Sequence, residues 1–300
     1  MSANPAPAPP AGVLPVEKPV GPTSHDAVAA VRRALRTRQV GHTGTLDPFA
    51  SGLLLVCVGA ATRLAEYFAP LPKTYVATMR LGEATDTDDH TGEVIASSDG
   101  WRSLARGEVE AALAGQVGTI QQVPPAYSAK KVEGERMYAV ARRGGEVERK
   151  PVTVTIYAIR IVSIDLPDVV FEVDCGSGTY IRAIARDAGE ALGVGGHLRE
   201  LRRTRIGPHD VARAVPMDRL GEADLVARAM LAPAEAVAHL PRVVVDEQGE
   251  ADLRHGRAVA AGGAAGEGPV ALVSADGALL AIGEAAEGRV RPRKVFAGAA

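Results

Sequence analysis

Cysteine is scarce in this chain of 300 residues: Cys57 and Cys175 are the only two, and both lie in apolar stretches. Two such cysteines cannot staple a fold of this length, and apolar neighbours favour buried, inert thiols over redox chemistry. Long apolar runs are also missing, because the longest, residues 53–61, is far short of the roughly 18 residues of a membrane helix. The first residues carry no secretory signal pattern. We therefore expect a cytoplasmic protein without a membrane partner.

Charge of one sign is lacking as well, since the formal net charge is −2. A global basic field is thereby excluded, but the charge is unevenly distributed. Residues 81–110 hold eight acidic and two basic side chains, whereas residues 1–80 hold eight basic and four acidic ones. Arginine outnumbers lysine 28 to 6, which suits phosphate binding but agrees equally well with GC-rich coding. The charge pattern is therefore compatible with a local basic groove that binds a polyanion.

Common cofactor motifs are absent too. No Gly-Lys pair exists, so there is no Walker A loop, and the glycines of residues 176–181 do not form a dinucleotide fingerprint. Residues 86–97 resemble a calcium loop, but the glycine comes one place late and Ser97 occupies the position of the bidentate glutamate. The seven histidines never approach zinc-site spacing. We expect neither a metal nor a cofactor.

What is present is enough apolar material for a folded protein, 46% of the residues. Strand and helix patterns mix without regular βαβ alternation, so the fold class is α+β. We expect a disordered Pro/Ala-rich tail over residues 1–12, a main domain over 13–215 and a helical connector over 216–240. The short β-like runs over 241–297 then predict a small all-β domain.

Periodicity places the main elements. Ser24 is typical of an N-cap before a helix with Val28, Val31 and Leu35 on one stripe. Residues 53–58, 75–81, 152–162 and 169–175 are expected strands, and residues 82–100 an acidic loop. Further helices are predicted around residues 137–141 and over 181–192, the latter directly after a glycine turn.

Asp47 stands out among the polar residues. It precedes Pro48 in a loop rich in glycine and threonine, directly before a buried strand. An aspartate before proline is most often only a turn-former. A polar loop on a rigid scaffold is also where functional sites are built, however, and His42, Thr43 and Thr45 crowd the same loop.

At this loop the chain resembles a known family. Residues 41–54 (Gly-His-Thr-Gly-Thr-Leu-Asp-Pro-Phe-Ala-Ser-Gly-Leu-Leu) are similar to the catalytic loop of the bacterial tRNA pseudouridine-55 synthases, the TruB family. Five further segments resemble family motifs in the same order: residues 17–25, 73–75, 85–92, 124–134 and the stretch from 178–182 to 197–203. One small departure is Gln39-Val40 before Gly41, where the family often has lysine, and another is Lys130 where leucine is common.

The resemblance implies a fold and an activity. The fold is a pseudouridine synthase catalytic domain, with a central mixed or antiparallel sheet and flanking helices, followed by a small C-terminal β-rich PUA-like domain. The activity is isomerisation of uridine 55 in the tRNA T-loop to pseudouridine, without cofactor or metal, by a protein expected to be a monomer. The target base must leave the stack, which costs a few kcal/mol and least in a loop.

The resemblance also implies roles for individual residues. Asp47 is the nucleophile, acting by attack on C1′ or through a glycal, and Arg182 is its ion-pair partner. Tyr75 stacks on the flipped base and takes part in proton abstraction. From the residues alone, Arg182 reads as a helix-surface partner of Asp187 or Glu190, and Tyr75 as core. Further motif positions expected to contact substrate or RNA are Lys18, His42, Asp89, Tyr180, Leu201, Arg202 and Arg203.

Basic side chains are expected to dock the RNA, each phosphate contact steepening the salt dependence of binding. Candidates for the groove include Arg32, Arg33, Arg36, Arg38, Arg142, Arg143, Arg199 and Arg205, and for the C-terminal domain Arg289, Arg291 and Arg293. Two other functions stay open at this point: a tRNA-binding chaperone that needs no chemistry, and, with weaker support, a metal-dependent nuclease using the acidic cluster of residues 86–93.

Overall fold

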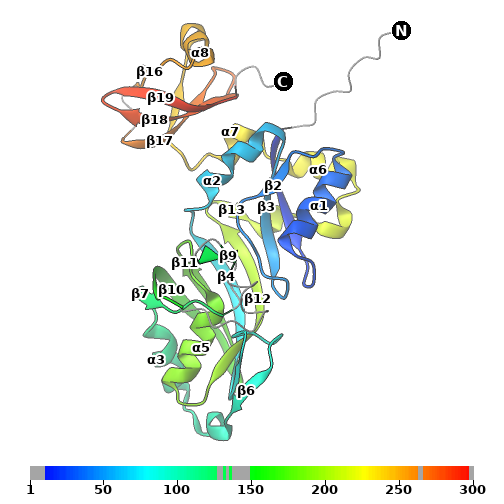
Figure 1. Ribbon diagram of the computed structural model, residues 1–300, viewed down its shortest axis with the longest axis vertical. Helices are drawn as coiled ribbons and strands as arrows, with labels where there is room; N and C mark the ends of the chain where they lie inside the picture. The colour runs from blue at the N-terminus through cyan, green and yellow to red at the C-terminus, as the bar shows by residue number, and fades with distance from the viewer. Residues whose placement is uncertain (1–10, 127–130, 133–134, 137–148, 263–265, 297–300) are drawn as a thin grey trace.

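Ten strands pair into one long sheet in the computed structural model, which describes residues 11–126, 131–132, 135–136, 149–262 and 266–296. The order is β14-β1-β3-β12-β4-β11-β10-β7, with β2 on β3 and β13 on β12 (Figure 1). Their bounds are β1 Gly12–Lys18, β2 Val40–His42, β3 Ser51–Val58, β4 Lys73–Leu81, β7 Gly118–Gln122, β10 Val152–Asp165, β11 Asp168–Cys175, β12 Gly196–Ile206, β13 His209–Asp210 and β14 Val215–Pro216. The sheet is mixed but mainly antiparallel, as expected.

One face of the β4–β11–β10 region is covered by two helices, α3 (Arg106–Ala114) and α5 (Ile181–Ala191). The predicted alternation in β11 is present: Val169, Phe171, Val173 and Cys175 point into this core. Burial raises the pKa of the Cys175 thiol to about 11 and that of Cys57, inside β3, to about 12. Both cysteines are therefore inert core residues in the folded protein.

At the other end of the sheet, α1 (Ser24–Ala34) packs its Val28 and Val31 against β1 and β3. Its N-cap is Thr23, one residue earlier than predicted from the sequence. Thr23 forms a capping box with Asp26, whose pKa is lowered by hydrogen bonds from the Thr23 side chain and backbone. Ser24 is instead buried, and its hydroxyl bonds both the carbonyl and the amide of Leu46.

The two halves of the sheet meet at β12, which pairs antiparallel with β4 and parallel with the start of β3. This junction requires a glycine: Gly52 has a φ of 106°, and a Cβ there would lie 2.3 Å from the Arg203 carbonyl oxygen. The segment between β2 and β3, residues 43–50, is thereby fixed over the middle of the sheet. It carries Asp47.

Residues 82–100 are more ordered than the acidic loop predicted for them. They contain a small ladder of β5 (Glu83–Thr85) and β6 (Val94–Ser97), followed by the 3-10 helix η2 (Asp99–Ser103). Strand propensity is weak in this acidic stretch, and its order comes from distant partners: the amide of Gly82 bonds the carbonyl of Gly195, and Asp89 forms a bridge with Leu198. A reading of local periodicity cannot include such contacts.

The chain continues through short helical turns into a second sheet. The connecting elements are the 3-10 helices η3 (Val211–Arg213) and η4 (Met217–Arg219), and the helices α6 (Ala223–Ala229) and α7 (Pro233–Ala236). The second sheet has the order β15-β17-β18-β19-β16, built from β15 Arg242–Val244, β16 Val259–Ala260, β17 Gly268–Val273, β18 Leu279–Ala286 and β19 Arg289–Val295. This region is β-rich as expected, but it also contains the helix α8 (Glu247–Arg254), so it is not all-β.

Figure 1 shows the second sheet at one end of an elongated molecule, beside the segment that follows β3. That segment comprises η1 (Gly59–Leu64) and α2 (Ala65–Phe68). Phe68 shares an apolar cluster with Ile282 of β18 and Phe296. The helix predicted around residues 137–141 lies outside the described residues. Shortly before it, β8 (Lys131–Val132) and β9 (Glu135–Arg136) pair as a short antiparallel ladder. Among the described helices, none is long and apolar enough to cross a membrane.

Candidate active site

Asp47 lies in the turn between β2 and β3, and its side chain is about one-third exposed. Hydrogen bonds hold the residues on either side of it. The Ser24 hydroxyl fixes Leu46, and the amide of Ala50 bonds the carbonyl of Asp47 itself. The turn is thus anchored on both sides of the carboxylate. A fixed, accessible carboxylate is what a nucleophile in this position requires.

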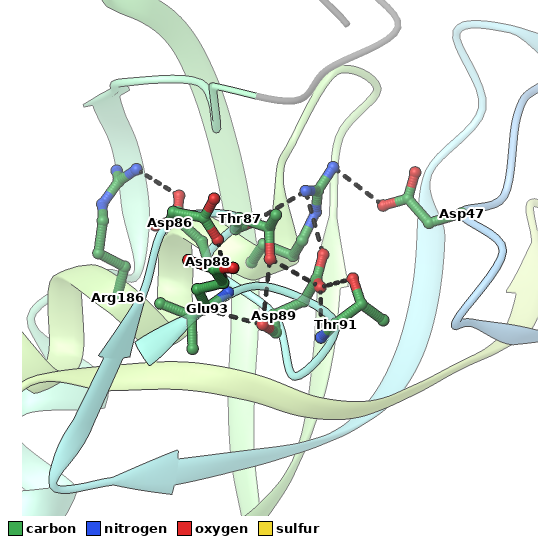
Figure 2. A network of polar contacts seen from close by, with 10 residues as sticks. Asp47, Asp86, Thr87, Asp88, Asp89, Thr91, Glu93 and Arg186 are labelled. Carbon is green, nitrogen blue, oxygen red and sulfur yellow. Dashed lines mark hydrogen bonds and ion pairs between the residues drawn. The ribbon is translucent and has the colours of Figure 1, made fainter. Parts of the chain in front are cut away.

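Arg182 bridges Asp47 and a second carboxylate, that of Asp89. Figure 2 labels the two aspartates. Arg182 Nη2 lies 3.1 Å from Asp47 Oδ2 and its Nη1 lies 3.2 Å from Asp89 Oδ2, while Nη1 also donates to the carbonyl of Thr87 at 2.9 Å. The guanidinium is 7% exposed and the Asp89 carboxylate 5%. The planar guanidinium of arginine suits this double role. It orients Asp47 and is itself held by residues 85–92, hereafter the acidic segment. The ion pair implied by the family resemblance is therefore present.

A cavity of about 250 Å³ opens beside this ion pair. It brings together residues from four parts of the chain, namely Thr45, Leu46, Asp47, Tyr75, Thr179, Tyr180, Ile181, Arg182 and Leu201. Five residues expected at the site from the sequence line it: Asp47, Tyr75, Tyr180, Arg182 and Leu201. Its walls are aromatic and aliphatic with one charged corner, which suits a flat, neutral heterocycle.

Tyr75 of β4 provides an aromatic wall of the cavity. Burial raises the pKa of its phenol, an effect that the charge of Arg203 opposes. The phenol is therefore protonated at neutral pH, which favours a stacking role over that of a phenolate base. Leu201 of β12 pairs across the sheet with Ala77 and closes the cavity from the same side.

Tyr180 lies at the start of α5, where Gln122 of β7 clamps its backbone. The Gln122 amide donates to the carbonyl of Tyr180 at 3.0 Å and accepts from its N–H at 2.8 Å. Gln122 has no exposed surface. Nothing in the sequence marks it, because its partner is 58 positions away.

His42 ends β2 next to the loop of Asp47 and makes an edge contact with His25, at 5.5 Å between ring centroids. Burial lowers its pKa, as do the charges of His25 and Arg203, so its imidazole is neutral at neutral pH. Its Nδ1 is buried without a hydrogen-bond partner among the described residues. A neutral ring at this position can stack on a base.

Two of the expected RNA contacts lie beneath the loop rather than on the surface. Lys18 has no exposed surface, and its Nζ donates to the carbonyls of Ala50 (2.6 Å), Pro22 (2.8 Å) and Pro48 (3.4 Å). Arg203 is 2% exposed and donates from Nε to the carbonyl of Leu53 at 2.8 Å, and to the carbonyls of Gly44 and Thr45. Both cations support the loop backbone from inside, a different role from the predicted contact with RNA.

The remaining predicted contacts divide by exposure. Arg202 is half-exposed but paired with Glu17, and Asp89 is buried against Arg182 instead of facing solvent. Arg199 and Arg205 likewise pair with Asp168 and Asp210. Four arginines around the end of α1 are exposed: Arg32, Arg33, Arg36 and Arg38. Arg32 also donates to the carbonyl of Val40. Arg142 and Arg143 lie outside the described residues.

Sequence reasoning missed one arginine. The partners expected for a helix-surface Arg182, Asp187 and Glu190, are instead those of Arg186, which also pairs with Asp88. Among the described residues, no group of three His, Cys, Asp or Glu side chains could hold a metal ion. The acidic segment is occupied by arginines and its own hydrogen bonds.

Models of one protein family match the chain almost throughout. The "TruB family pseudouridylate synthase (N terminal domain)" matches residues 32–181, and the "tRNA pseudouridylate synthase B C-terminal domain" matches residues 182–244. A further model, "Pseudouridine synthase II TruB, C-terminal", matches residues 241–296.

Curated relatives and solved structures agree with these models. The tRNA pseudouridine synthase B of Thermobifida fusca is 46% identical over 96% of this chain and 99% of its own length, and that of Arthrobacter sp. (strain FB24) is 44% identical over 95% and 96%. A chain of a Cbf5-Nop10-Gar1 complex superposes with a TM-score of 0.74 at 30% identity, over 95% of this chain and 84% of its own. The chain thus belongs to the TruB family of pseudouridylate synthases.

Proposed function

We propose that this protein is a tRNA pseudouridine synthase that isomerises uridine 55 in the T-loop of tRNA. The observation that carries the proposal is Asp47, held by Arg182 at the mouth of an aromatic and aliphatic cavity. The expected partner, tRNA, follows from relatives named tRNA pseudouridine synthase B. We further propose that the enzyme acts as a monomer in the cytoplasm, where tRNA is found.

The first step is extrusion of the uridine into the cavity. Its uracil stacks on Tyr75, beside Leu201 on the same side of the cavity, and neutral His42 takes the place that the base leaves in the RNA stack. Aromatic stacking is worth about 1–3 kcal/mol per base, which offsets the cost of unstacking. The protein is thus suited to a loop nucleotide, whose release costs least.

The chemical steps redistribute one bond and one proton. The N1–C1′ bond breaks, the uracil turns, the C5–C1′ bond forms, and the hydrogen on C5 leaves as a proton while N1 gains one. Asp47 either forms an ester with C1′ or removes a proton from C2′ to give a glycal, and both routes need an ionised carboxylate beside the sugar. The ion pair with Arg182, at 3.1 Å, fixes the direction of the Asp47 carboxylate. No oxidant, reductant or energy source enters the balance.

The test is pseudouridine mapping on an unmodified tRNA transcript incubated with the purified protein. Wild-type protein should produce one pseudouridine, at position 55, and Asp47→Asn should produce none while it still binds the transcript. The matched control is Asp99→Asn, which alters an aspartate whose side chain is 83% exposed on η2 and should leave the reaction unchanged. Turnover by Asp47→Asn at the wild-type rate would refute the assigned nucleophile.

A second function, tRNA refolding without chemistry, is compatible with the exposed Arg289, Arg291 and Arg293 on β19. These three side chains belong to a strand next to the edge of the second sheet, outside the cavity residues, and can bind phosphates whether or not Asp47 is intact. In this role the Asp47→Asn protein should refold misfolded tRNA as well as wild type does. Failure of both proteins to accelerate refolding would eliminate it.

A further inference from the structure

Arg186, one turn after Arg182 on α5, is the centre of a second ion-pair group. Its guanidinium is 13% exposed; Nη1 lies 2.8 Å from Asp88 Oδ2, and Nη2 lies 2.7 Å from Asp187 Oδ1. Nη2 also donates to the carbonyl of Val123 at 2.9 Å. One side chain therefore joins α5 to the acidic segment and to the residue that follows β7. None of these contacts involves the cavity itself.

The acidic segment, residues 85–92, is the structure that Arg186 grips. Figure 2 shows how tightly it is tied internally around Asp89. Asp89 Oδ1 accepts from the Thr87 hydroxyl at 2.9 Å and from the Thr91 amide at 3.0 Å, and the Thr85 hydroxyl bonds its carbonyl. The segment is therefore cross-linked around Asp89, the residue next to Asp88.

Asp88 itself is held in a costly conformation. Its φ is 59°, in the left-handed region that non-glycine residues seldom adopt, and it is only 7% exposed. Burial raises the pKa of its carboxyl, which the charges of Arg186 and Arg182 oppose. An unpaired carboxylate buried here would be expensive. The buried Asp88 carboxylate has this partner in Arg186, while backbone bonds of Asp88 and His90 to Leu198 hold the segment on β12.

We propose that Arg186 is a positioning residue for the isomerisation, acting through Asp88 and the acidic segment to hold Asp89 and the Thr87 carbonyl against Arg182, and thereby Arg182 against Asp47. The inference rests on the proposed function for its kinetic consequence, but not for its structural one. Two arginines one turn apart on α5 thus divide the work: Arg182 orients the reactive carboxylate, and Arg186 secures the support of Arg182.

The kinetic test is a double-mutant cycle between Arg186→Gln and Asp89→Asn, measured as the single-turnover rate at saturating tRNA. Arg186→Gln should lower the rate by at least about tenfold, since small displacements of reacting groups carry penalties of that size, while the Kd for tRNA stays within about twofold. In the Asp89→Asn background the same change should cost less than about threefold, because the two residues act on one element. Losses that multiply, or a wild-type rate for Arg186→Gln, would overturn the proposal.

A matched control and a milder variant accompany the cycle. Arg106→Gln removes an arginine that pairs with Glu110 at 2.7 Å on the exposed side of α3, and should leave both rate and tRNA affinity unchanged. Asp88→Asn keeps the backbone tolerance for positive φ and one acceptor for Arg186, so it should fold and lose less activity than Arg186→Gln. A larger loss for Asp88→Asn than for Arg186→Gln would contradict the proposed order of action.

A crystal structure of Arg186→Gln separates this inference from the proposed function. The acidic segment should be displaced, with the contact between Asp89 and Arg182 lengthened or lost, whatever the enzyme's activity. An unchanged segment would overturn the inference even if pseudouridine forms. Absence of pseudouridine with the wild-type protein would instead refute the proposed function. The structural prediction would then be tested by the crystal structure alone.

Discussion

At the scale of single residues, buried cations hold the turn that carries Asp47. The Lys18 ammonium donates to the carbonyls of Pro48 and Ala50, which follow Asp47, and Arg203 bonds the carbonyls of Gly44, Thr45 and Leu53. A backbone carbonyl that loses its only donor in the interior costs roughly 1–3 kcal/mol. Lys18 and Arg203 therefore fix the backbone of the loop that carries Asp47 from beneath its surface.

Lys18 also gives the stability a characteristic pH dependence. Burial lowers its pKa from 10.5 to about 8, although the nearby charge of Asp47 opposes this shift. Between about pH 8 and 10.5 the unfolded chain keeps a proton that the native state has released, so this group raises the unfolding free energy with increasing pH, at most on the order of 1.4 kcal/mol per pH unit. Below pH 8 both states are protonated and the contribution is constant.

The corresponding prediction compares wild type with Lys18→Met by chemical denaturation at several pH values. Lys18→Met should be less stable at pH 7, by roughly 2–4 kcal/mol, because the carbonyls lose their donor. The difference in favour of wild type should widen from pH 8 to pH 10. Taking the difference cancels the other titrating groups, among them Lys73, whose pKa burial also lowers to about 8. A gap that narrows with rising pH would contradict the burial argument.

At the scale of elements, α5 is the most constrained part of the site, because it carries both Arg182 and Arg186 and packs closely on β12. The close contact occurs at Gly189, where a Cβ would lie 2.3 Å from the carbonyl carbon of Gly195 and the amide nitrogen of Gly196. Both atoms are backbone and cannot move aside alone. The helix can approach the strand this closely only with glycine at this position.

Gly189→Ala is therefore expected to destabilise the protein by roughly 2 kcal/mol or more, as overpacking does, and to lower activity by displacing α5. A helical glycine with open space provides the control: a Cβ added at Gly107 in α3 would meet no neighbouring group within 4 Å, so Gly107→Ala should stabilise by about 0.5–1 kcal/mol. Thermal unfolding of the two variants checks both signs. Equal effects would show that the packing argument is wrong.

The elements most open to prediction were those with clear periodicity. The alternation in β11 and the stripe on α5 follow from a buried face, and both elements lie where the pattern indicates. The ladder of β5 and β6 could not be foreseen, because its order depends on Gly195 and Leu198, more than a hundred residues away. The prediction of Ser24 as the N-cap of α1 was wrong for a related reason. The Ser24 hydroxyl bonds the backbone of Leu46, which is remote in sequence, and Thr23 caps the helix instead.

The difference between local patterns and remote contacts also applies to the site. The pairing of Asp47 with Arg182 followed only from the family resemblance, because the residues alone favoured Asp187 or Glu190 as partners for Arg182. The support by Gln122, by the contact of Arg186 with Asp88 and by Arg203 has no local signature, since these partners are remote in sequence. Motifs therefore identified the groups around the cavity, whereas tertiary structure was needed to separate them from the groups that hold them in place.

At the scale of the whole molecule, the C-terminal sheet is attached to the segment that directly follows β3. Arg63 lies 5.0 Å over the ring of Phe296 and donates to the carbonyl of Val295, while Lys294 pairs with Glu66 and donates to the carbonyl of Arg63. We propose that residues 13–215 form the catalytic unit, 216–240 a connector and 241–297 an RNA-binding unit. The shared cluster around Phe68 joins the two units.

This attachment predicts cooperative unfolding. Wild type should show a single calorimetric transition, and Phe296→Ala combined with Lys294→Ala should separate an earlier transition of the C-terminal unit, because a buried aromatic contact worth roughly 3 kcal/mol is lost. Arg254→Ala on the exposed side of α8 serves as the control and should leave one transition. Two transitions already in wild type would contradict the coupling.

The central claim, that Asp47 drives the isomerisation of one loop uridine, is tested most directly by proton release from C5. A tRNA transcript labelled with tritium at C5 of its uridines is incubated with each protein, and the tritium released to water is counted. The account predicts one equivalent per tRNA with wild type, none with Asp47→Asn, and none when position 55 is changed to cytidine. Release by Asp47→Asn at the wild-type rate, or from the transcript without uridine 55, would contradict it.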